Sequence, residues 1–154
     1  MQTEHGRFLS NERAGMVDLF NKVSADAGSW LNIAFVELED ESTEPDSTFF
    51  SFLAARGPAN PLATLLRENA DSPMSVGIQH RAGTKAAEQL REAQHFAPDD
   101  ARVRQDHPRR GLVLEWPDSA SSEELVDWLL PAMRILNRAR LGEALVWSWS
   151  RKES

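Results

Sequence analysis

The sequence predicts a single α+β domain over residues 1–154, in which a mostly antiparallel or mixed sheet of five or six strands has helices packed against it. Three observations predict this class. Several short segments alternate apolar and polar residues, as half-buried strands do, and two longer segments repeat apolar residues at helical spacing. The chain is 41% apolar and 27% charged, which is typical of one globular domain, and it contains no internal repeat or linker. The expected order of elements is αββαβαββαβ.

A helix over 11–27 is the first element expected. Ser10 is suited to cap its N-terminus. The apolar residues that recur at helical spacing are Met16, Leu19, Phe20, Val23 and Ala27. A strand over 30–39 follows, and 49–55 is a second apolar run, so the two segments predict a hairpin with a long acidic loop.

The middle of the chain predicts a short helix, a strand and a second helix. Asn60 followed by Pro61 is typical of a helix start, and one side of this helix would carry leucines. Residues 74–80 alternate between two faces and predict a half-buried strand. A helix is expected over 83–95, where the apolar stripe is weak and indicates a thin contact with the sheet.

The second half predicts two strands, over 101–105 and 111–116, and then a long helix. Ser121 and Glu124 have the spacing of a capping box at the start of this helix. Its continuous apolar stripe consists of Leu125, Trp128, Leu129, Ala132, Met133, Leu136 and Ala139. Pro131 lies inside the helix and predicts a kink or a break, because proline removes a backbone hydrogen bond there.

The last expected strand, over 143–150, predicts a homodimer. Trp147 and Trp149 share one face of it, no charged residue follows Glu143 within it, and a terminal strand is often an unpaired edge. In a two-fold contact, the acidic loop over 37–46 of one copy would meet the basic hairpin over 102–110 of the other. In the alternative interpretation both tryptophans face their own helices and the chain is a monomer.

Charge and composition disfavour several classes of protein. Residues 1–77 carry five basic and twelve acidic side chains, whereas residues 78–154 carry twelve of each. A net charge of −7 argues against nucleic-acid binding. The chain contains no cysteine, so we expect no zinc ribbon and no iron–sulfur site. It contains no run of 18 apolar residues and its N-terminal segment has no apolar stretch, so we expect neither a membrane span nor secretion, and we predict a cytoplasmic protein.

A candidate anion site lies where the strand over 74–80 is expected to turn into the next helix. The free N–H groups of a helix N-terminus favour an anion, and basic side chains accompany them here. The candidate residues are His80, Arg81, Gly83, Thr84 and Lys85. In the alternative interpretation the glycine forms a turn, the threonine caps the helix and the charged side chains are solvated.

A second basic cluster occupies the hairpin predicted over 101–116. Guanidinium groups suit carboxylate and phosphate ligands, and both clusters would face one ligand if the hairpin lay beside the strand ending at His80. The candidate residues are Arg102, Arg104, His107, Arg109 and Arg110. The alternative is a charged hairpin that keeps a sheet edge soluble, or arginines that pair with acidic residues of the first half.

These patterns favour a non-catalytic binding or assembly module that recognises a protein partner or itself. The sequence contains no G-x-S-x-G, H-E-x-x-H or G-x-G-x-x-G motif, and no metal or cofactor is predicted. The alternative function is a small enzyme or ligand-binding domain for an anionic metabolite. Its arginines would hold the ligand, and His80 or His107 would act as general acid–base.

Overall fold

The computed structural model describes residues 1–37, 60–80, 85–108, 110–138 and 140–152. Its elements follow in the order β1, α1, β2, β3, β4, α3, β5, β6, α4 and β7. The strands are β1 (Gln2–Leu9), β2 (Ser29–Glu37), β3 (Leu62–Arg67), β4 (Met74–Gln79), β5 (Arg102–His107), β6 (Gly111–Trp116) and β7 (Leu141–Arg151). The helices are α1 (Arg13–Ala25), α3 (Ala86–Glu92) and α4 (Ser122–Ile135).

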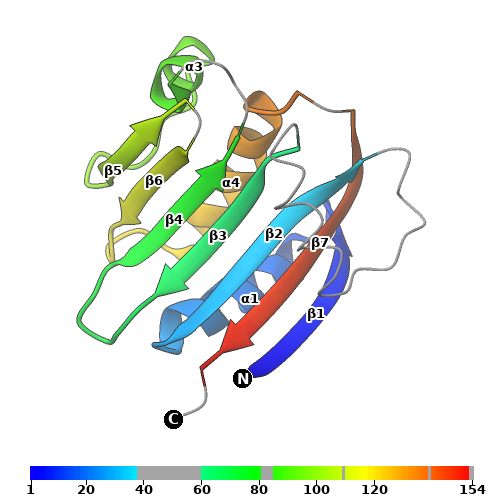
Figure 1. Ribbon diagram of the computed structural model, residues 1–154, viewed down its shortest axis with the longest axis vertical. Helices are drawn as coiled ribbons and strands as arrows, with labels where there is room; N and C mark the ends of the chain where they lie inside the picture. Colours follow the sequence, from blue (N-terminus) through cyan, green and yellow to red (C-terminus); the bar gives the residue numbers. More distant parts are fainter. Residues whose placement is uncertain (38–59, 81–84, 109, 139, 153–154) are drawn as a thin grey trace.

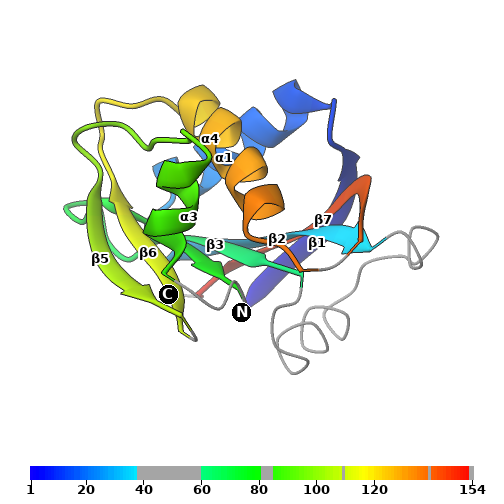
Figure 2. The same ribbon diagram turned by 90° about the horizontal axis from the view of Figure 1, so that it is seen from above.

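The strands form one antiparallel sheet in the order β1-β7-β2-β3-β4-β6-β5 (Figure 1). All three helices of the described part lie on the same face of this sheet (Figure 2). The main core fills the space between the helices and the sheet. The predicted α+β class is therefore confirmed, although the described part of the chain already forms a sheet of seven strands where five or six were expected.

The prediction of a short helix after Asn60 is wrong, because the segment Leu62–Arg67 forms strand β3 between β2 and β4. Its apolar residues are buried on both faces of the sheet. Leu65 joins the core under the helices, whereas Leu62 joins a smaller apolar cluster on the opposite face. Asn60 does not cap a helix, since its side-chain amide donates to the backbone oxygen of Phe35 at 2.6 Å. The predicted strand over 49–55 lies outside the described residues.

Strand β1 was missed, and its presence changes the position of β7. The side chains of β1 are largely exposed and polar, so no amphipathic pattern marks it. β1 and β2 both pair with β7, which is therefore an interior strand and not the expected edge. Trp149 is buried in the main core, and the half-buried Trp147 stacks on Phe8 at 6.1 Å between ring centroids. The edge argument for an interface at Trp147 and Trp149 is thus wrong.

Helix α1 begins two residues later than predicted. Its N-cap position is Glu12, which makes no side-chain capping hydrogen bond. Ser10 does not cap the helix, because its hydroxyl donates to the carboxylate of Glu143 at 2.6 Å. The predicted apolar stripe is nonetheless buried, and the residues of α1 in the core are Met16, Leu19, Phe20 and Val23.

The structure confirms most of what the sequence predicts for helix α4. The hydroxyl of Ser121 accepts the backbone N–H of Glu124 at 3.1 Å, so the expected cap is present. Pro131 does not divide the helix, which continues to Ile135. The side chain of Pro131 is exposed, so the proline ring faces away from the core and the apolar face packs without interruption.

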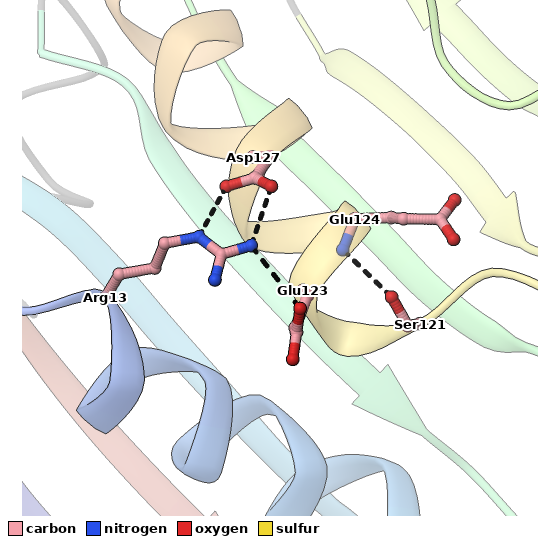
Figure 3. A network of polar contacts seen from close by, with 5 residues as sticks. All are labelled: Arg13, Ser121, Glu123, Glu124 and Asp127. Atoms are coloured by element: carbon pink, nitrogen blue, oxygen red, sulfur yellow. Dashed lines mark hydrogen bonds and ion pairs between the residues drawn. The ribbon is translucent and has the colours of Figure 1, made fainter.

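An ion-pair network joins the start of α1 to the first turns of α4 (Figure 3). The guanidinium of Arg13 donates to both carboxylate oxygens of Asp127, at 2.8 and 2.7 Å, and lies 3.8 Å from Glu123. The hydrogen bond from Arg13 lowers the pKa of Asp127. Because these side chains are exposed, we regard the network as a contact that orients the two helices and contributes little to stability.

Candidate binding groove

Part of the predicted anion site lies at one end of the sheet. β4 ends before His80, β5 ends at His107, and β6 begins after the tight turn that contains Arg110. Arg102 and Arg104 lie at the opposite end of β5, where Arg102 is in register with Glu115. The structure therefore does not bring all the predicted residues together. Arg81, Gly83, Thr84 and Arg109 lie outside the described residues.

The first N–H groups of α3 already have a partner that the sequence did not indicate. The carboxylate of Asp106 accepts the backbone N–H of Ala86 at 2.9 Å and that of Ala87 at 3.4 Å. A carboxylate of the chain itself thus occupies the place where an anionic ligand was expected at this helix start. Lys85 precedes these residues and is exposed. An anion site formed by the remaining candidates stays a prediction.

Two basic side chains of the hairpin, those of Arg104 and His107, make contacts within the hairpin. Arg104 forms an ion pair with Glu115 across the two strands. His107 accepts the backbone N–H of Arg110 through Nδ1 at 3.1 Å, and the side chain of Gln105 donates to the backbone oxygen of Arg110 at 3.3 Å. The contacts of His107 and Gln105 with Arg110 stabilise the turn of the hairpin.

His80 is fully buried at the end of β4. Burial lowers the pKa of its imidazole, the carboxylate of Asp106 opposes this shift, and the charge of Arg138 adds to it. The folded chain therefore favours the neutral imidazole.

This burial predicts a pH dependence of stability. Below the ordinary histidine pKa of 6.5, the unfolded chain takes up a proton that folded His80 resists, so the free energy of unfolding should fall between pH 7 and pH 5. We expect the decrease to be shallower in His80→Gln, as measured by urea unfolding at a series of pH values. Equal slopes for the two proteins would show that His80 is not held neutral.

A different part of the surface is apolar and hollow, where α3 and the segment after it face β5, β6 and α4. It contains a cavity of about 180 Å³. An adjoining hollow of about 370 Å³ shares His95, Phe96, Ala97 and Trp128 with it and extends to Trp116. We call this surface the β5–α3 groove, and its cavity is lined by Ala87, Leu90, Arg91, His95, Phe96, Ala97, Val103, Leu112, Leu114 and Trp128.

The end of α3 positions one wall of the groove. Gln94 adopts a left-handed conformation with φ of 54°, and the N–H of His95 returns to the backbone oxygen of Leu90 at 2.9 Å. This turn directs His95 toward α4, where its Nε2 lies 2.7 Å from the backbone oxygen of Trp128. The His95 ring also stacks on that of Trp128, at 6.0 Å between centroids. Phe96, the next residue, is left largely outside the core.

Two large apolar side chains of the groove are exposed to solvent. Phe96 is 68% exposed and Val103, on the edge strand β5, is 56% exposed. Neither residue was a candidate site residue from the sequence, although Leu112, Leu114 and Trp116 fall in one predicted strand. The alternation of apolar and polar residues in β6 indicates from the sequence which residues form the floor of the groove. The walls of the groove come from segments that are distant along the chain, so no sequence pattern indicates them.

The described residues contain no group of three or more histidines and acidic residues that could hold a metal ion. None of the helices in the described part of the chain has the length and apolar character needed to cross a bilayer. In the comparisons with known proteins, no family model, curated protein or solved structure matches this chain.

Proposed function

We propose that this chain is a non-catalytic binding or assembly module that recognises a polypeptide, either a protein partner or a second copy of itself, through the β5–α3 groove. The observation that carries the proposal is the exposure of Phe96 and Val103 beside an apolar cavity. Grouped apolar side chains at the surface mark interaction sites, because water contact with them is unfavourable until a partner covers them.

The chemistry of the groove indicates an apolar side chain as the group that it binds. The cavity of about 180 Å³ is lined mainly by aliphatic and aromatic residues. Strand β5 is less suited to pair with an added strand. Its register shifts between Val103 and Gln105, and exposed arginines flank Val103. Irregular, charged edges oppose strand addition, so recognition would depend on side chains.

The alternative function, an enzyme or ligand-binding domain for an anionic metabolite, has less support. Asp106 already accepts the first N–H groups of α3, and His80 is fully buried. Arg102 and Arg104 lie at the far end of β5 from His80. A general acid–base must be able to reach its substrate. The burial of His80 and its distance along the sheet from Arg102 and Arg104 do not favour this role.

Selection of random peptides displayed on phage tests the proposed function. We expect the selected peptides to share a large apolar residue and to bind the Val103→Asp variant at least about tenfold more weakly, because the carboxylate would enter an apolar contact. Isothermal titration calorimetry with one synthetic peptide measures the affinities. Leu9→Asp is the matched control, since Leu9 is 50% exposed on the edge strand β1 at the opposite side of the sheet. Peptides that bind all three proteins equally would contradict the proposal.

A further inference from the structure

The groove carries, on one patch, both a protruding apolar side chain and a cavity that could receive one. Phe96 is 68% exposed and also lines the rim of the cavity of about 180 Å³. The cavity floor, which includes Leu112 and Leu114 of β6, is buried and apolar. A two-fold contact places the same surface on both sides, so it requires a patch that is complementary to itself, and a patch with both a protruding side chain and a cavity meets this requirement.

We infer that the occupant of the β5–α3 groove is a second copy of this chain, so that two copies form a two-fold dimer in which each inserts Phe96 into the groove of the other. This inference rests on the proposed function and specifies its partner. The contact differs from the one expected at β7, since β7 is an interior strand and β5 is an edge.

The distribution of charged side chains around the groove favours contact with a second copy of this chain. The chain as a whole has a net charge of −7, which disfavours contact between two copies over most of the surface. The segment 86–104 is nearly balanced, since it carries four acidic and three basic side chains. The exposed acidic residues around the groove lie on α3, on the turn before β5 and on α4, where Glu124 and Asp127 line the adjoining hollow, and the exposed arginines lie mainly on β5. In a two-fold contact, the acidic part of one copy can face the basic part of the other.

The dimer would be held by side chains and not by a continuous sheet. The register shift at Arg104 interrupts the edge of β5, and Arg104 is paired with Glu115 of its own chain. The contact therefore centres on Phe96, Val103 and the exposed side of α3. Burial of Phe96 against an apolar floor would supply the main favourable term.

Sedimentation equilibrium of the full chain at micromolar concentration tests this inference. We expect a mass of twice 17.3 kDa for the natural sequence and for the Leu9→Asp control. Phe96→Asp should weaken association at least about tenfold, because it places a charge in an apolar cavity. Since Phe96 is largely exposed, this variant should keep the urea unfolding curve of a folded monomer.

A complementation experiment tests the reciprocal insertion of Phe96. Phe96→Ala removes the protruding ring, and Ala87→Phe fills the cavity that receives it, so each variant alone should associate weakly. An equimolar mixture retains one intact insertion, because the natural Phe96 of the second variant meets the open cavity of the first. We expect the mixture to associate at least about tenfold more tightly than either variant alone. No gain on mixing would overturn the reciprocal contact.

The outcomes separate this inference from the proposed function. A single species of 17.3 kDa at all concentrations overturns the dimer. If peptides selected on that monomer still lose affinity on Val103→Asp, the groove binds another protein and the proposed function stands. If neither association nor peptide binding depends on the groove, both proposals are wrong.

Discussion

Replacing Leu129 by alanine is expected to lower the free energy of unfolding by about 2–5 kcal/mol, because the change removes buried methyl groups and leaves a cavity. Leu129 is fully buried in the main core, on the face of α4 that packs toward the sheet. Its neighbours on this face include Leu125, Met133 and Leu136, which are also fully buried. Urea unfolding followed by tryptophan fluorescence and far-UV circular dichroism measures the change.

Leu130→Ala is the matched control for this prediction. Leu130 has the same side chain and occupies the next position of the same helix, but it is only partly buried. Both substitutions change intrinsic helix propensity equally, so the difference between them reports packing. We expect a smaller loss for Leu130→Ala. A loss below about half a kilocalorie per mole for Leu129→Ala would show that this face of α4 is not in the core.

Elements with a strong local pattern could be predicted from the sequence. The stripe of α4 repeats over almost four turns, and the Ser121 cap marks its first residue. Strands β4 and β6 alternate between buried and less buried residues over most of their length. In each case a single buried face determines the pattern, so the period of the apolar residues identifies the element.

Elements whose burial depends on distant partners could not be predicted in this way. β3 carries apolar residues on both faces, since Leu65 belongs to the main core and Leu62 to the smaller cluster on the opposite face, so it has no simple alternation, and the local Asn60-Pro61 signal favoured a helix. β1 is largely polar because it is an edge, and its pairing with β7 is long-range. Without β1, the sequence placed β7 at an edge and its tryptophans in an interface.

The candidate sites show the same division between local and tertiary information. Charged residues that are close in sequence suggested an anion site, but Asp106 binds the α3 N-terminus from a strand twenty residues away. The β5–α3 groove joins Phe96, Val103 and Trp128, which come from three different elements or loops. No local pattern relates these residues, because only the packing of α3 between β5 and α4 brings them together.

Replacing Gly111 by alanine is expected to lower the free energy of unfolding by about 2–6 kcal/mol. Gly111 has φ of +96°, a conformation that costs a residue with a side chain about 1–3 kcal/mol. An added Cβ would also lie 2.4 Å from the backbone oxygen of Ile78 and 3.2 Å from Cα of Gln79. Because these are backbone atoms of the neighbouring strand β4, the overlap is relieved only by moving β6, at a cost of about 1–3 kcal/mol.

Gly28→Ala separates the two causes of this loss. Gly28 also has a positive φ, of +85°, but beyond its chain neighbours no heavy atom lies within 4 Å of the place that a Cβ would take. Urea unfolding of Gly28→Ala should therefore report conformational strain alone, at about 1–3 kcal/mol. The additional loss in Gly111→Ala then measures how tightly the start of β6 packs against the end of β4. Equal losses in the two variants would mean that β6 can move away from β4 at no cost, which contradicts the close contact between these strands at the end of the sheet that carries His80.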